Sequence, residues 1–139
     1  MNVCSADWRF VSGAMAQLEL SVSTDFRARM SIPDHQGECR HPHGYRFVVK
    51  VTAVVALPEG GKPWTTDLVA IETATQDVVT ELNGRNLADL IDYPSFEAIL
   101  MWLVARLRER IAGLKHVELS APPRYAMTWS EDVSDGGST

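Results

Sequence analysis

Hydrophobic and polar residues alternate along residues 18–32. Apolar side chains occupy almost every even-numbered position, and charged or hydroxyl side chains occupy the odd-numbered ones. A period of two puts the apolar set on one face of a β-strand, so this stretch predicts a long, half-buried strand. A second strand is predicted at 45–57, after a turn-rich connection. Both are long for a globular protein, which suits a large sheet or a barrel formed between subunits.

Helical spacing replaces this alternation in the middle of the chain. One helix is predicted behind Asp67, which we expect to be its N-cap, and "NGRN" ends it in a turn where Gly84 takes a positive φ. A second is predicted from Pro94 to Gly113. The expected buried positions are Leu68, Ile71, Thr75, Val78 and Leu82 in the first helix and Phe96, Ile99, Leu100, Leu103, Leu107 and Ile111 in the second, with Met101 and Trp102 outside the stripe.

Two short strands close the pattern, at 116–121 and 124–129, joined at Pro122-Pro123. The order strand, strand, helix, helix, strand, strand predicts an α+β fold with an antiparallel sheet. We expect a single domain over residues 1–130. Residues 131–139 are small, polar and acidic, so we expect a disordered tail there.

Composition limits the classes of function. The 139 residues suffice for one domain with a real core, and the net charge of -5 argues against a nucleic-acid partner. No apolar run approaches the roughly 20 residues of a membrane span, so no membrane partner and a cytoplasmic location are expected. The two cysteines, Cys4 and Cys39, make no disulfide framework and are expected to be reduced.

A cluster of reactive side chains precedes the second predicted strand. His41 and His43 are two residues apart, so on a strand they project to the same side and could converge on one metal ion. They could equally be hydrogen-bonded histidines at a strand entrance. Cys39 is either an inert thiol or a nucleophile.

Five short motifs, in order along the chain, carry a resemblance to a known family. They are "FRARM" at 26–30, "HPHGY" at 41–45, "GKPWTTDL" at 61–68, "YPSFE" at 93–97 and "VELS" at 117–120. In this order they resemble 6-pyruvoyltetrahydropterin synthase and 6-carboxytetrahydropterin synthase, the tunnelling-fold (T-fold) pterin enzymes. The resemblance implies an antiparallel sheet with two helices on one face, closed into a barrel by homo-oligomerisation as a trimer or hexamer.

The departures from the family pattern fall on its chemistry. The resemblance implies three histidine ligands for zinc, matched here by His41, His43 and Met30. A thioether is a poor zinc ligand and Met30 continues the apolar face of its strand, so a packing role and a protein without zinc are expected. If zinc binds, the third ligand would come from the loop before His41, which holds Glu38, Cys39 and His35.

The proton-transfer unit is altered as well. The family's Asp-His pair is matched by Asn83 and Gly84, neither of which can act as a general base near neutral pH. Cys39 stands where the family has a catalytic cysteine, although closer to the histidines.

Substrate-binding residues are also implied by the resemblance. Glu118 would hold a pterin ring through its carboxylate, or it is a solvated strand glutamate. Tyr45 and Glu97 are further candidates, and an acid such as Glu97 is also expected in a first helical turn because of the helix dipole.

These observations leave three hypotheses open. We favour a divergent enzyme, repurposed as a lyase or cyclase for a small heterocyclic or specialised-metabolite substrate, with Cys39, His41 and His43 as catalytic groups. A second is a non-catalytic homologue that binds a pterin or purine or has a structural role. A third is a genuine pterin synthase with a substitute third zinc ligand. Fold alone does not decide among them.

Overall fold

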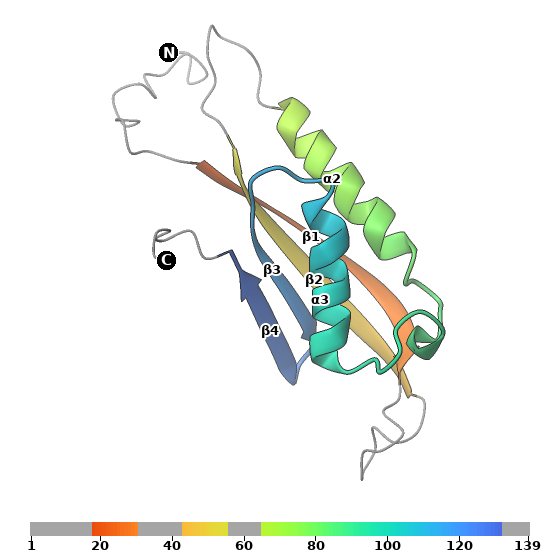
Figure 1. Ribbon diagram of the computed structural model, residues 1–139. Coiled ribbons are helices and arrows are strands. Elements are labelled where there is room, and N and C mark those ends of the chain that lie inside the picture. The colour runs from red at the N-terminus through yellow and green to blue at the C-terminus, as the bar shows by residue number, and fades with distance from the viewer. Residues whose placement is uncertain (1–17, 31–42, 56–64, 132–139) are drawn as a thin grey trace, which may run out of the picture.

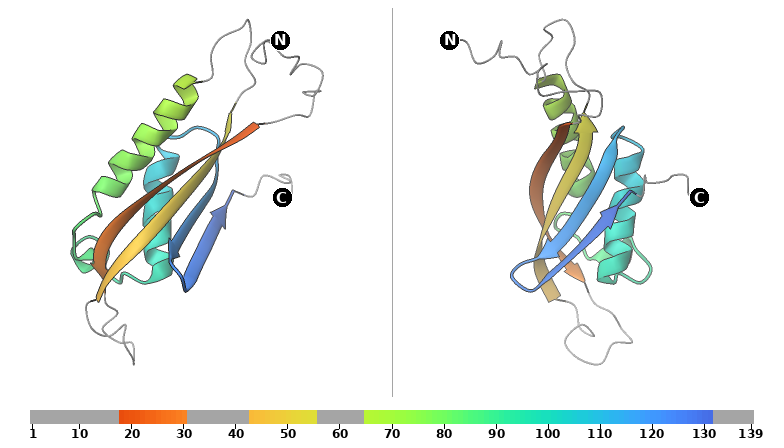
Figure 2. Two further views of the ribbon diagram at one scale, coloured as in Figure 1. Left: turned by 180° about the vertical axis from the view of Figure 1, so that it is seen from behind. Right: turned by 90° about the vertical axis from the view of Figure 1, so that its left-hand side faces the viewer.

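The protein forms a twisted four-stranded antiparallel sheet with two helices on one face (Figures 1 and 2). The computed structural model describes residues 18–30, 43–55 and 65–131. The strands, in sheet order, are β1 (Leu18–Met30), β2 (His43–Val55), β3 (Leu114–Ala121) and β4 (Tyr125–Ser130); the helices are α2 (Thr65–Thr80), the short 3-10 helix η3 (Leu87–Asp89) and α3 (Phe96–Arg108). The expected α+β fold and its ββααββ order are confirmed.

The core lies between the sheet and the helices. Alternate residues of β1 and β2 face it, and Phe26 and Phe47 stack there with ring centroids 5.0 Å apart. Leu103 and Leu107 of α3 pack onto the same layer and are fully buried. The alternation predicted for residues 18–30 is therefore a real division between a core face and a polar face.

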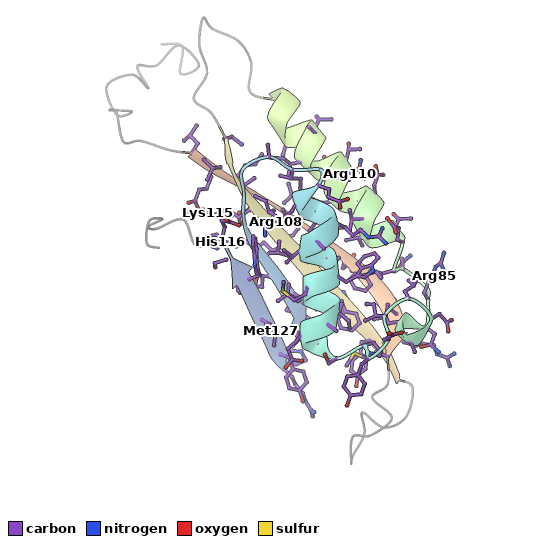
Figure 3. The ribbon with its side chains drawn as sticks, in the orientation of Figure 1. Arg85, Arg108, Arg110, Lys115, His116 and Met127 are labelled. Atoms are coloured by element: carbon purple, nitrogen blue, oxygen red, sulfur yellow. The ribbon has the colours of Figure 1, made fainter. Side chains whose placement is uncertain are left out.

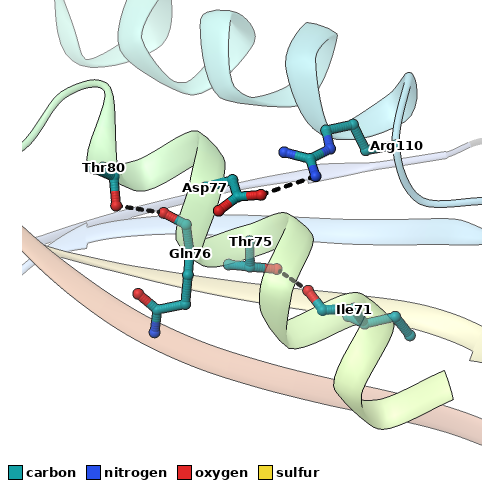
Figure 4. Close-up of polar contacts among 6 residues, drawn as sticks. All are labelled: Ile71, Thr75, Gln76, Asp77, Thr80 and Arg110. Atoms are coloured by element: carbon teal, nitrogen blue, oxygen red, sulfur yellow. Dashed lines mark hydrogen bonds and ion pairs between the residues drawn. The ribbon is translucent and has the colours of Figure 1, made fainter. Parts of the chain in front are cut away.

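The two helices are tied together at their exposed sides by ion pairs. Arg106 of α3 contacts Glu81 at 2.7 Å, and Arg110, just beyond α3, contacts Asp77 of α2 at 2.9 Å. Figure 4 shows the second pair beside Thr75, whose hydroxyl donates to the carbonyl of Ile71. These pairs are solvent-exposed, so their contribution to stability is small compared with that of the buried apolar faces.

Both helix boundaries differ from prediction. α2 begins at Thr65, so Asp67 lies in its first turn and the prediction of an N-cap there was wrong. An N-cap flanks the helix and is not itself helical, so Asp67, which lies inside α2, cannot be its cap. Leu68 is exposed, whereas Ile71, Thr75, Val78 and Leu82 are buried as expected.

α3 is capped by the Ser95 hydroxyl, which accepts from the N–H of Ala98, and it ends at Arg108. It therefore stops before Gly113, the predicted end. Gly113 has a φ of 79° and lies in the turn that leads into β3. Met101 is half exposed, and it lies outside the buried stripe as predicted.

The segment after α2 covers part of the edge of β1. The N–H of Arg27 donates to Asn83 Oδ1, and Gly84 N–H donates to the Arg27 carbonyl. The N–H of Arg29 donates to the Arg85 carbonyl. Gly84 has a φ of 78°, which confirms the predicted helix-ending turn. The Asn83–Gly84 pair thus terminates α2 and satisfies the backbone of β1.

No helix in the described part of the chain is both long and apolar enough to cross a membrane. Glu131, the first residue of the expected tail, still pairs with β3, because its N–H donates to the Lys115 carbonyl at 2.8 Å. Residues 132–139 lie outside the described ranges.

Candidate functional site

A groove of about 1020 Å³ opens at one end of the molecule, on the side of the sheet that carries the helices. The end of β1, the start of β2, the N-terminus of α3 and the β3–β4 turn all meet there (Figure 1). β3 pairs with β2 only along Val48–Ala53, so the first residues of β2 extend past it. The groove therefore lies where the start of β2 is not paired with β3.

Aromatic rings form a continuous chain along this groove. Tyr45 and Phe47 of β2 have centroids 5.8 Å apart, and Phe47 lies 6.2 Å from Phe96 at the start of α3. Phe96 in turn lies 6.3 Å from Tyr125, the first residue of β4. Tilted rings at such distances pack favourably and leave flat apolar faces. This lining suits a planar ligand.

Three charged residues line the groove as well. Arg46 lies between Tyr45 and Phe47 on β2, so its side chain projects from the opposite face of the sheet, where it forms an ion pair with Asp25 at 3.0 Å. Glu97 and Arg124, in contrast, have no hydrogen-bond or ion-pair partner for their side chains among the residues that the structure describes. An apolar groove with a few convergent charged groups is the usual form of a small-molecule site.

The structure brings together some of the predicted site residues. Tyr45 and Glu97 line the groove, and so does Met30, whose side chain is buried. His43 begins β2 directly opposite Met30 in the strand register, which places its backbone at the same end of the sheet. Cys39 and His41 lie outside the described residues, as does the side chain of His43.

Glu118 lies elsewhere. In β3 the side chains of Val117 and Leu119 are fully buried beneath the helices, so Glu118 between them projects from the opposite face of the sheet. Its register partners are Lys50 on β2 and Thr128 on β4. Within one protomer, Glu118 is thus separated by the sheet from the groove that holds Tyr45 and Glu97.

Of the three zinc-ligand positions implied by the family resemblance, the structure describes the side chain of Met30. Met30 occupies the first ligand position with a buried thioether, which zinc does not favour. Within the described ranges, no group of three or more His, Cys, Asp or Glu side chains could hold a metal ion.

A second hollow lies at the other end of the molecule, lined by Arg108, Lys115 and Glu131 among others (Figure 3). Its cations are already neutralised, because Arg108 contacts Glu131 at 3.3 Å and Lys115 contacts Glu19 at 2.6 Å. The hydrogen bond from Lys115 lowers the pKa of Glu19, and the nearby positive charge acts in the same direction. These contacts are typical of surface pairing, so this hollow is the weaker candidate.

Sequence reasoning missed Arg124, Tyr125 and Phe96 as site residues. The signal lay in topology: an antiparallel β2–β3 pair places the end of β3 beside the start of β2. The "PPRY" turn after β3 must therefore lie next to "HGY" at 43–45, the start of β2. Residue types alone do not reveal this proximity.

The match to known proteins agrees with this fold. A family model described as 6-pyruvoyl tetrahydropterin synthase matches residues 19–132, from β1 to just beyond β4. The chain belongs to this family. This is the family that the five sequence motifs resemble, so the predicted family membership is confirmed.

Solved structures of 6-pyruvoyl tetrahydropterin synthases share the architecture. The Caenorhabditis elegans enzyme superposes with a TM-score of 0.72 over 84% of this chain and 97% of that chain, at 17% identity. The Plasmodium falciparum enzyme superposes with a TM-score of 0.63 over 83% of this chain and 98% of that chain, at 13% identity. At these sequence identities the structural similarity establishes the T-fold. The reaction has to be inferred from the residues of the groove.

A curated relative is more similar in sequence over a shorter stretch. Dihydroneopterin monophosphate aldolase from Pyrococcus furiosus is 30% identical over 71 residues, which is 51% of this chain and 60% of the relative. The match thus spans about three-fifths of the length of that protein.

Proposed function

We propose that this family member is a lyase or cyclase acting on a small heterocyclic substrate in the groove, without the zinc ion and Asp-His pair of the pterin synthases. The observation that carries the proposal is a contrast between the groove and the positions that match the catalytic groups of the synthases. The groove keeps an aromatic lining and charged residues, whereas Met30 occupies a zinc-ligand position and Asn83 bonds the backbone of β1. This contrast supports a site that binds a ligand but differs from the synthases in its metal ligands and in its proton-transfer pair.

A lyase reaction is the better supported form. The aldolase relative is named for dihydroneopterin monophosphate, and an aldolase cleaves a carbon–carbon bond. In such a step a base takes the proton of the side-chain hydroxyl, which becomes the carbonyl of the released aldehyde as the carbon–carbon bond breaks. The electron pair of that bond is delocalised into the conjugated ring system, and an acid then protonates the carbon that remains attached to the ring. Atoms and charge balance without a redox partner.

The candidate acid and base groups lie in the sequence just before β2 and at its first residue. Cys39, His41 and His43 are the proposed catalytic residues, because histidine titrates near neutral pH and a nearby imidazole can activate a thiol. His43 opens β2 opposite Met30. Tyr45 and Glu97 are proposed to bind the substrate, as they line the groove.

The test is turnover by the purified full chain with dihydroneopterin, its monophosphate and its triphosphate, with products identified by mass spectrometry. We expect cleavage of at least one substrate, at a rate unchanged by a chelator, with less than stoichiometric zinc in the protein. His43→Asn should abolish turnover. His116→Asn should not, because His116 lies at the other end of the sheet beside Ser130.

Two outcomes would support the competing hypotheses. Stoichiometric zinc with chelator-sensitive conversion of the triphosphate would indicate a pterin synthase with a substitute ligand. Tight binding with no turnover of any substrate would indicate a non-catalytic pterin-binding homologue.

A further inference from the structure

Two arginines oppose each other on the face of the sheet that is turned away from the helices (Figure 2). Arg27 lies between the buried residues Phe26 and Ala28, so its side chain projects from this polar face. Arg46 projects from the same face, where it forms an ion pair with Asp25. The register of β1 and β2 places Arg27 directly opposite Arg46. Like charges at directly opposite positions destabilise a sheet, so this pair weakens the fold.

The arginine pair departs from the charge pattern of the same face. Farther along β2, Lys50 has a residue of opposite charge, Glu118, as its register partner on β3. At the arginine pair, Asp25 contacts Arg46 at 3.0 Å and compensates that charge. The side chain of Arg27 is exposed and has no hydrogen-bond or ion-pair partner among the residues that the structure describes. Its positive charge is therefore available to a ligand.

A third arginine borders an open part of the sheet face beside this pair. Arg29 lies two residues beyond Arg27, projects from the same face and also has no described partner for its side chain. Its register partner on β2 is Gly44, and a Cβ added to Gly44 would meet nothing within 4 Å. Gly44 lies two residues from Arg46 on the same face. The three arginines thus border a position that a glycine leaves open.

Protection of an exposed edge does not account for this arrangement. Charged side chains on an edge strand discourage pairing with other chains, and Arg27 and Arg29 lie on β1, an edge strand. The loop after α2, however, already bonds the backbone N–H groups of both residues. Arg46 lies on β2, an inner strand, where edge protection has no role. The repulsive pair therefore has another use.

We propose that Arg27, Arg29 and Arg46 form a binding site for a diphosphate group on the polar face of the sheet. The planar guanidinium group matches phosphate oxygens bidentately, and the bound negative charge offsets the repulsion between the opposed arginines. Arg27 and Arg29 start about 7 Å apart along β1, so two linked phosphates match them better than one. The groove lies on the helix side of the sheet, so this site is separate from that of the proposed reaction.

Isothermal titration calorimetry of the full-length chain with phosphate, pyrophosphate and ADP, at constant ionic strength, tests the site. Pyrophosphate and ADP should bind more tightly than phosphate. Arg27→Gln and Arg29→Gln should each weaken pyrophosphate binding about 10- to 100-fold. Arg27→Lys should restore part of that loss, because lysine keeps the charge but lacks the planar fork. Equal Kd values for pyrophosphate and ADP would support recognition of the diphosphate alone, and tighter binding of ADP would support a nucleotide as its source.

Thermal unfolding gives a second readout, which a purely structural role of Arg27 would not produce. Without ligand, Arg27→Gln should raise the Tm by about 1–4 °C, because it removes one member of the repulsive pair. Pyrophosphate should raise the Tm of the wild type and have much less effect on Arg27→Gln. Sodium chloride at the same ionic strength screens the repulsion without binding bidentately, so it should stabilise the wild type less than pyrophosphate does.

Two variants that remove the same charge elsewhere serve as matched controls. Arg110 contacts Asp77 on the helix side, and Arg124 lines the groove. Arg110→Gln and Arg124→Gln should bind pyrophosphate like the wild type. The proposal would be overturned by a wild-type chain that does not bind pyrophosphate, by a loss in Arg124→Gln as large as that in Arg27→Gln, or by equal stabilisation with chloride and pyrophosphate. None of these measurements depends on turnover in the groove.

Discussion

Two glycines with the same backbone conformation show how context decides the importance of a residue. Gly84 and Gly113 have φ values of 78° and 79°. A Cβ added to Gly84 would meet nothing within 4 Å, whereas at Gly113 it would lie 2.6 Å from the carbonyl oxygen of Val54. The same Val54 donates its N–H to the Gly113 carbonyl at 2.8 Å, so the strand cannot move away without losing that bond.

Gly113→Ala should therefore destabilise the protein more than Gly84→Ala. We expect a loss of about 1–2 kcal/mol for Gly84→Ala from the left-handed conformation alone. For Gly113→Ala the contact with Val54 adds to that strain, and we expect a total of about 3 kcal/mol or more. Urea unfolding of both variants measures the difference, and equal losses would contradict the contact.

Glu19 gives the fold a dependence on acid pH. Its pKa is lowered below 4.5, first by the hydrogen bond from Lys115 and then by the positive charges of Lys115 and His116. A carboxyl with a depressed pKa in the folded state stabilises the fold above its ordinary pKa, and this contribution is lost as the pH falls through the folded value.

Glu19→Gln should accordingly lose less stability on acidification than the wild type. The comparison is the free energy of unfolding at neutral pH and at a pH well below 4.5, with Glu72→Gln on α2 as the control. A drop in Glu19→Gln as large as that of the wild type would show that the Lys115 pair has no part in acid sensitivity.

At the scale of elements, α3 links the core to the groove. Its buried stripe packs on the sheet, and its first turn brings Phe96 and Glu97 to the ligand side. The apolar periodicity predicted the stripe but misjudged both ends of the helix. Helix ends depend on caps such as Ser95 and on where the chain must turn, and these are weakly encoded in residue type.

Alanine substitutions at a buried and at an exposed position of α3 should differ in how much stability they remove. Leu103 is fully buried and Met101 is 50% exposed. Leu103→Ala should cost about 2–5 kcal/mol from lost burial and the cavity left behind. Met101→Ala should change stability by about 0.5 kcal/mol or less. Thermal or urea unfolding provides the test, and similar losses at the two sites would contradict the assignment of the buried face.

For the whole molecule, the open edges of the sheet point to assembly. β1 and β4 are the edge strands, and among the described residues the loop after α2 covers β1 only near Arg27 and Arg29. Long uncovered edges are prone to pairing, and closure with further copies into a barrel would satisfy them. We therefore propose a homo-oligomer of three or six copies, whose barrel interior would be the polar sheet face that carries Glu118.

Proline substitutions in β1 can test this proposal. The N–H groups of Arg27 and Arg29 point away from β2, toward the covering loop, so the N–H of Ser23 points outward too and that of Thr24 points to β2. Ser23→Pro should dissociate the oligomer and leave the protomer folded. Thr24→Pro should destabilise the protomer itself by about 1–3 kcal/mol, because it removes a hydrogen bond to β2 and leaves the acceptor unsatisfied.

Analytical ultracentrifugation of the wild type and both variants gives the mass, and circular dichroism reports on folding. A wild-type chain that stays at 15.4 kDa across micromolar concentrations would contradict the assembly.

The sequence alone determined the family, through its motifs, and the element order, through the change from strand to helix periodicity. It also determined the faces of the strands, because side chains alternate between the two faces of a strand whichever strands pair with it. It also marked Met30 and Asn83–Gly84 as departures from the synthase pattern. Only the tertiary structure separated Glu118 from Glu97 and brought Arg124 to the groove. Which side chains share a site depends on strand register and on the sheet face, and both follow from packing between segments distant in the chain.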